Sequence, residues 1–244
     1  MQGEIDEMKR TLLTAGFVLV FFFGMIGLTA APEEESLPKN LRWMSKAAEQ
    51  GDAEAQADLG AAYFYGRGVP QDRKTAAKWL RKSADQGFAR AQNLLGRMYL
   101  KGLGVTQNSA EAAKWFRKAA DQGFARGQYN LAVLYYTGRG VTQSYKEAWK
   151  LFRKSADQGF AKAQNHLGTM YANGLGTAKN ETEAVKWYRK SAEQGFARAQ
   201  YNLAGMYING LGVAKNRAEA IKWYRKAAEQ DDQAAKETLE ALGK

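Results

Sequence analysis

The sequence repeats itself with a fixed period of 36 residues. The dipeptide Gln-Gly recurs five times at this spacing, with its glycines at Gly51, Gly87, Gly123, Gly159 and Gly195. Self-similarity at such a period is typical of stacked supersecondary units rather than of one globular core. We therefore expect a linear array in which each unit packs against its neighbours.

Each unit contains a first helical segment with one apolar face. In one unit this face is formed by Ala91, Leu95 and Tyr99, which follow one another at the i, i+4, i+8 spacing of a buried helical stripe. The segment ends at the glycine pair Gly102 and Gly104, and the other units end in the same way. Glycine tolerates the positive φ angles that a helix C-terminus and the following turn require.

A second helical segment follows each glycine pair. It is expected to begin after a side chain that can accept hydrogen bonds from free backbone N–H groups. In four units a glutamate stands three residues later, which completes the pattern of a capping box. The five expected N-cap residues are Asp72, Asn108, Ser144, Asn180 and Asn216.

These patterns predict an all-α protein, an α/α solenoid of about five full helix-turn-helix repeats. Residues 41–244 form the solenoid, with full repeats starting at 53, 89, 125, 161 and 197. A half repeat before residue 53 and one closing helix after the last repeat are expected to cap the two ends. Residues 32–40, which contain two prolines, are expected to be a linker.

The N-terminal segment is expected to direct export. Residues 11–31 are uncharged, mostly apolar and long enough to form a helix that spans a bilayer. Lys9 and Arg10 precede them and acidic residues follow, so the repeats should lie outside the cytoplasm, in a periplasmic or secreted protein.

Two interpretations of residues 1–31 remain open. The apolar run ends in small residues near Ala30, as a cleaved signal peptide does, and a start at Met8 instead of Met1 would give a typical leader. The alternative is an uncleaved anchor in the inner membrane, which would be the chain's one membrane contact.

The composition limits the chemistry that the chain can carry. It has no cysteine, so neither disulfides nor thiolate metal sites are available, and no carboxylate and histidine cluster has metal-ligand spacing. We therefore expect no metal and no cofactor. The formal net charge of +11 favours anionic partners, although an exported chain is not expected to bind nucleic acid.

The repeat residues resemble those of a known family. Ala-x-Ala-Gln-x-x-Leu-Gly-x-Met-Tyr, Gly-x-Gly-Val and Glu-Ala-x-Lys-Trp-Tyr-Arg-Lys-Ala-Ala-Glu-Gln-Gly, found across residues 41–242, are similar to motifs of the Sel1-like repeat (SLR) family within the tetratricopeptide-type superfamily. The resemblance implies an α/α solenoid that acts as an adaptor, often exported in bacteria. A cysteine-rich subgroup is linked to β-lactam binding, and this chain lacks those cysteines.

No catalytic constellation is expected. Ser36 and Lys39 match the Ser-x-x-Lys of β-lactam-binding hydrolases, but Pro38 stands between them in a linker, and neither Ser-Asp-Asn nor Lys-Thr-Gly occurs. His166, the chain's one histidine, has no Ser or Asp in motif context around it and is expected on a helix surface. We therefore predict a monomeric protein that is not an enzyme.

A row of first-helix residues beside the buried stripe varies between units. Core positions repeat because each must fit the same neighbour, whereas this row does not. The resemblance places first helices on the concave side, where the row would form a groove for a protein or peptide partner. The same side chains could instead pack between repeats. The candidate groove residues are Phe64, Arg97, Leu100, Tyr129, Val133, Tyr136, Tyr201 and Ile208.

A basic ridge along the second helices is the alternative site. Stacked repeats would align its lysines into a surface that could dock to an anionic envelope component. Nearby Glu and Asp residues at helical spacing would weaken this field. The ridge lysines are Lys78, Lys82, Lys114, Lys118, Lys150, Lys154, Lys186 and Lys190.

The third repeat departs from the pattern of its second helix. Trp149 stands two residues early, and Leu151 takes the position that tryptophan has in the other repeats. Either the two residues exchange volume within the core, or the exchange creates a local surface feature.

Overall fold

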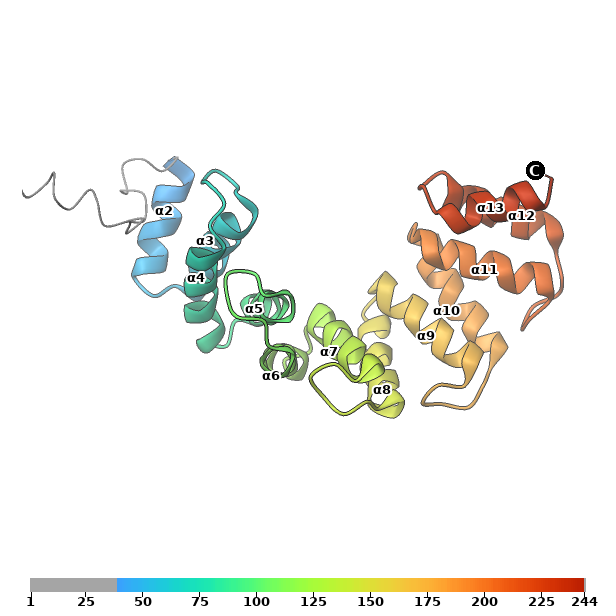
Figure 1. Ribbon diagram of the computed structural model, residues 1–244, viewed down its shortest axis with the longest axis horizontal. Helices are drawn as coiled ribbons and strands as arrows, with labels where there is room; N and C mark the ends of the chain where they lie inside the picture. Colours follow the sequence, from blue (N-terminus) through green and yellow to red (C-terminus); the bar gives the residue numbers. More distant parts are fainter. Residues whose placement is uncertain (1–38, 244) are drawn as a thin grey trace, which may run out of the picture. The chain divides into compact units, whose positions relative to one another are not determined.

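The computed structural model describes residues 39–243, and this range is helical with no strand (Figure 1). The N-terminal segment 1–31, with its hydrophobic residues 11–31, and most of the linker lie outside the described residues. No helix within the described range is both long and apolar enough to cross a membrane. The helices are α2 (Lys39–Glu49), α3 (Ala53–Tyr65), α4 (Arg73–Asp85), α5 (Ala89–Lys101), α6 (Ser109–Asp121), α7 (Ala125–Thr137), α8 (Tyr145–Asp157), α9 (Ala161–Asn173), α10 (Glu181–Glu193), α11 (Ala197–Asn209), α12 (Arg217–Ala228) and α13 (Gln233–Ala241).

The helices form consecutive pairs, from α3 with α4 to α11 with α12, and each pair packs against the next (Figure 1). The single helices α2 and α13 close the two ends of the array. The predicted α/α solenoid is therefore confirmed. Helix α2 begins at Lys39, two residues before the expected boundary, so Lys39 and Asn40 belong to the helix and not to a linker.

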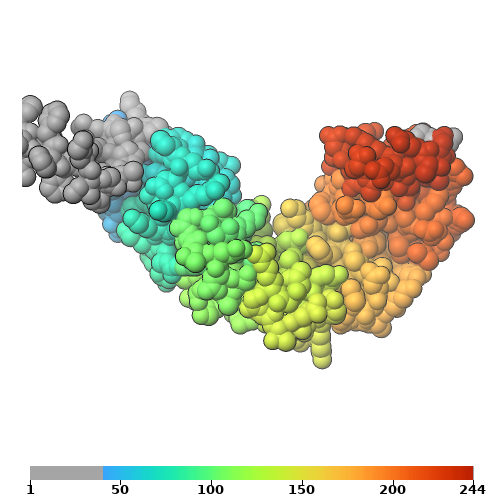
Figure 2. Space-filling model, viewed as in Figure 1, coloured from blue at the N-terminus to red at the C-terminus, as the bar shows by residue number. Residues whose placement is uncertain are grey.

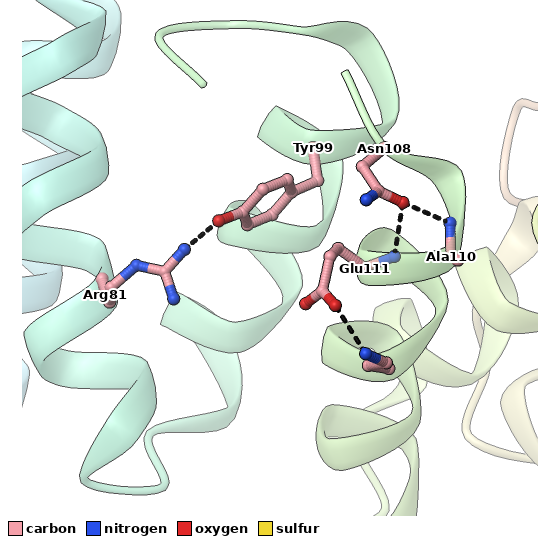
Figure 3. A network of polar contacts seen from close by, with 6 residues as sticks. Arg81, Tyr99, Asn108, Ala110 and Glu111 are labelled. Atoms are coloured by element: carbon pink, nitrogen blue, oxygen red, sulfur yellow. Dashed lines mark hydrogen bonds and ion pairs between the residues drawn. The ribbon is translucent and has the colours of Figure 1, made fainter. Parts of the chain in front are cut away.

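All five predicted N-cap residues accept hydrogen bonds from the first turn of a second helix. In Figure 3 the Asn108 side chain points at the N–H groups of Ala110 and Glu111, both at 3.0 Å. The second half of the expected capping box is not formed. The N–H of Asn108 donates to the carbonyl of Tyr99 at 2.9 Å, so the Glu111 carboxylate pairs with Lys114 instead.

Buried glutamines join the repeats. Gln92 on α5 accepts a hydrogen bond from Gln122 of its own repeat at 2.8 Å and donates one to the carbonyl of Ala84 in the preceding repeat at 3.1 Å. A buried amide without partners is costly, so these bonds also fix the register of neighbouring repeats. The same pair of bonds occurs at each of the other first-helix glutamines, Gln56, Gln128, Gln164 and Gln200.

Candidate functional site

A hollow of about 330 Å³ opens on the first helices in the middle of the array. Figure 1 shows α5 and α7 on the inner side of the bend in the repeat region, with α6 and α8 outside them, and Figure 2 shows the repeat region hollowed on that side. The hollow is lined by Asn93, Arg97, Arg126, Tyr129, Asn130, Phe160 and Lys162.

The structure places the eight predicted groove residues in different surroundings. Phe64 is buried, with 7% of its surface exposed, and its ring packs edge-on against Tyr65, so it contributes no groove surface. Tyr201 and Ile208 pack with the C-terminal cluster that includes α13. The hollow brings together only Arg97 and Tyr129 from the predicted set. The half-buried members of the set are Arg97, Leu100, Tyr129, Val133, Tyr136, Tyr201 and Ile208.

Part of the variable row packs between repeats, as the alternative interpretation held. Asn93, which stands in this row four residues before Arg97, and Asn165, at the same place on α9, are buried. Each accepts a hydrogen bond from an asparagine on the next first helix. The donors are Asn130, at 2.7 Å, and Asn202, at 2.9 Å. First helices of successive repeats therefore contact one another directly, and the Asn93–Asn130 pair lines the hollow.

His166 lies in an aromatic cluster and not on an open helix surface. Its ring stacks on that of Phe152, with centroids 4.8 Å apart and planes 2° apart. Its Nε2 lies 3.3 Å from the hydroxyl of Tyr129, and the ring of Tyr136 meets it edge-on. The helical pattern around His166 gave no sign of this, because its neighbours come from α7 and α8.

Burial lowers the pKa of His166. Between this lowered pKa and the unfolded value of about 6.5, the unfolded chain binds a proton that the folded chain does not. We therefore expect the free energy of unfolding to fall as the pH drops from about 7.5 to about 5.5, where the carboxylates remain mostly ionised. Chemical denaturation across this range measures the effect.

His166→Leu serves as the control for this pH dependence. Leucine occupies the corresponding place on α5, at Leu94, so the substitution suits the helix. Because the chain has no other histidine, the variant should show a nearly flat stability profile over the same range. An unchanged slope in the variant would show that other groups cause it.

Three cations surround the hollow: Arg97, Arg126 and Lys162. Arg126 and Lys162 are exposed, and Arg97 is half-buried. Within residues 39–243 none of the three forms an ion pair. The sequence-based prediction included Arg97 and missed the other two.

The residue at one first-helix position changes between repeats, and this change explains why Arg126 and Lys162 are unpaired. Between the preceding first helices, α3 and α5, Arg90 forms an ion pair with Asp58. Asp58 stands 32 residues before Arg90 in the sequence. The residues that occupy the place of Asp58 in the next two repeats are Leu94 and Asn130. Neither offers a charge to the cation that follows, so comparison of positions 32 residues apart would have revealed this feature.

The lysines of the basic ridge, unlike the cations at the hollow, mostly have partners within the protein. All eight of its lysines are exposed. Most have a partner on their own helix, either a glutamate three residues earlier or a tryptophan ring. Lys114, Lys150 and Lys186 pair with glutamates at 2.6 to 2.8 Å, and Lys82, Lys118 and Lys190 lie over tryptophan rings at 4.1 to 4.4 Å.

Comparison with solved structures shows the same architecture in several bacterial proteins. A protective antigen of uropathogenic Escherichia coli with an SLR fold is 39% identical, with a TM-score of 0.77, over 81% of this chain. This chain spans 42% of that antigen. A Sel1 repeat protein from Oxalobacter formigenes is 33% identical over 84% of both chains, also with a TM-score of 0.77.

A more distant structure shares the fold alone. An immunity protein from Pseudomonas aeruginosa is 21% identical over 78% of this chain and 72% of its own, with a TM-score of 0.51. No match was found among curated proteins. The Sel1 repeat model matches residues 41–52, 53–88, 89–124, 125–160, 161–196 and 197–232. The chain thus belongs to the Sel1 repeat family.

Proposed function

We propose that this protein is an exported interaction scaffold whose first-helix hollow holds an acidic segment of a protein partner. The fold is that of a protein-interaction scaffold. The observation that carries the choice of partner is the set of cations Arg97, Arg126 and Lys162, which surround the hollow without a carboxylate from the described residues.

The chemistry of the hollow suits glutamate or aspartate side chains on an extended peptide. Arginine can hold a carboxylate through two parallel hydrogen bonds, and Asn130 lines the same hollow with a polar side chain. Tyr129 and Phe160 supply apolar contact area for the rest of the segment. An acidic, partly apolar peptide would match both properties.

The hollow is favoured over the ridge for two physical reasons. Ridge lysines that already pair with glutamates or tryptophan rings would lose those contacts on docking, which offsets much of the gain. The hollow is lined by residues of the first helices, and α5 and α7 lie on the inner side of the bend (Figure 1), where an extended segment can enter and a flat anionic surface cannot follow.

Charge reversal of the hollow tests the proposal. The variant with Arg97→Glu, Arg126→Glu and Lys162→Glu should bind a fluorescein-labelled glutamate-rich peptide about 10- to 100-fold more weakly than the native chain, since each ion pair contributes about 0.5 to 1 kcal/mol. Fluorescence anisotropy of the full chain in detergent micelles measures this. Circular dichroism checks that helicity is retained.

The matched control makes the same charge change on the ridge. Lys82→Glu with Lys118→Glu and Lys190→Glu should change peptide affinity little at physiological salt, where the screening length is about 8 Å. Equal losses in both triple variants would mean that only net charge matters. A loss confined to the ridge variant would favour the anionic-surface alternative.

Export is proposed from residues 11–31, whose charge asymmetry is that of a secretory or anchoring segment. Cell fractionation combined with mass spectrometry of the mature N-terminus tests it. Recovery of the unprocessed chain in the cytoplasm would contradict it, whereas processing near Ala30 would identify a cleaved leader.

A further inference from the structure

The exchange of tryptophan and leucine in the third repeat leaves space unfilled. The ring of Trp149 lies edge-on to Tyr171 of the following repeat, with centroids 6.1 Å apart. Trp149 packs against the core and also forms one wall of the space beside Leu151. A hollow of about 410 Å³ opens there, with Leu131, Tyr135 and Leu151 among its walls. Trp149 and Leu151 both pack against the core, and a hollow remains open at the surface beside them.

The two adjacent repeats, with Trp115 and Trp187 at this position, show what occupies it there. The Trp115 ring has Arg81 of the preceding second helix at 5.7 Å and Lys118 of its own helix at 4.2 Å. The next comparable ring, Trp187, has Arg153 at 5.2 Å and Lys190 at 4.4 Å. Each ring thus attracts two cations from successive second helices through its π face.

In the third repeat the two cations are present and the ring is not. Arg117 and Lys154 occupy the positions of Arg81 and Lys118, and both line the hollow. Leu151 has no π face to offer them. Arg117 lies near the ring of Tyr135, at 5.9 Å, and so remains beside the opening.

We propose that this hollow binds an aromatic side chain of a protein partner, in the place that the repeat's own tryptophan has elsewhere. Its leucine and tyrosine walls bury the apolar body of a ring, and Arg117 and Lys154 face its π electrons. A saturated ring of the same shape gains the first interaction but not the second. This site includes second-helix residues such as Leu151 and Lys154, and it does not depend on the hollow that is proposed to bind an acidic segment at Arg97 and Tyr129.

The binding experiment uses N-acetyl-tryptophanamide as the probe. The full chain, labelled with ¹³C at leucine methyl groups and held in detergent micelles, is titrated with the probe. We expect saturable shifts of the Leu131 and Leu151 methyl signals, with a dissociation constant on the order of 1 mM. N-acetyl-phenylalaninamide should bind about fivefold or more tightly than its cyclohexylalanine counterpart.

Three variants make the test specific. Leu151→Trp fills the hollow as the other repeats do and should abolish the shift at Leu131. Lys154→Gln changes one exposed side chain and should weaken aromatic binding while leaving the cyclohexyl probe unaffected. Trp187→Leu recreates the hollow one repeat later and should add a second set of shifts at Leu167, provided that circular dichroism shows a folded chain.

Several results would overturn the inference. They are the absence of shifts at Leu131 and Leu151, unchanged binding in Leu151→Trp, and equal affinity for the phenyl and cyclohexyl probes. If Trp187→Leu does not fold, the other two variants still decide the question, because Lys154 is exposed and tryptophan occupies the position of Leu151 in neighbouring repeats.

Discussion

Replacement of Gly140 by alanine is expected to lower the free energy of unfolding by about 2 to 5 kcal/mol. Gly140 has a φ of 74°, which costs an alanine about 1 to 2 kcal/mol. A Cβ atom there would also overlap the carbonyl group of Ser109 and lie 2.7 Å from its Cβ. Most of the overlapping atoms belong to the Ser109 backbone, which cannot rotate away as a flexible side chain could. Urea denaturation followed by circular dichroism measures the loss.

Gly159→Ala is the matched control for Gly140→Ala. Gly159 has a φ of 86°, but an added Cβ would meet no atom within 4 Å. Its substitution should cost only the conformational strain, about 1 to 2 kcal/mol. Equal losses in the two variants would show that the loop at Gly140 can shift away from Ser109 at little cost.

The glycine pairs illustrate what the sequence could and could not predict. Their positive φ angles follow from the pattern of helix ends, and the structure confirms them. The close approach of the second glycine to the preceding repeat does not follow, because it depends on which atoms meet when two units stack. The second glycines that approach the start of a preceding second helix in this way are Gly104, Gly140, Gly176 and Gly212.

The buried glutamines show the same limit. The helical pattern identified the apolar stripe that contains Leu95, but Gln92 lies beside that stripe and is equally inaccessible. Its recurrence in every repeat was visible in the sequence. Recurrence of a polar residue on a first helix signals a hydrogen bond that every repeat boundary needs, and apolar periodicity alone does not show it.

The candidate site was predicted in part for a related reason. Variation between units pointed to the first-helix face that carries Arg97 and Tyr129, and these two residues line the hollow. A row taken along one helix cannot show which residues of the next helix complete a hollow, so Arg126 and Lys162 were missed. The opposite error occurred at Phe64, where a variable position is buried.

Phe152→Ala is expected to lower the free energy of unfolding by about 3 to 5 kcal/mol, as is usual for a fully buried phenylalanine. Phe152 has no exposed surface, and its ring contacts Tyr129, Tyr136 and His166 from two other helices. Its removal leaves a cavity where α7, α8 and α9 meet. Since neighbouring repeats stabilise one another, the loss should also separate the unfolding of the two ends of the array.

The same substitution should raise the pKa of His166 toward its ordinary value of about 6.5, because the Phe152 ring covers one face of the imidazole and shields it from water. NMR titration of the single histidine measures this pKa. Phe160→Ala is the control, because Phe160 is half-buried and its ring meets Tyr129 instead of His166. Phe160→Ala should lower the free energy of unfolding by less than Phe152→Ala does, and His166 should keep its lowered pKa. If Phe152→Ala folds and that pKa stays unchanged, the shielding comes from the tyrosines, and the stacked ring serves packing alone.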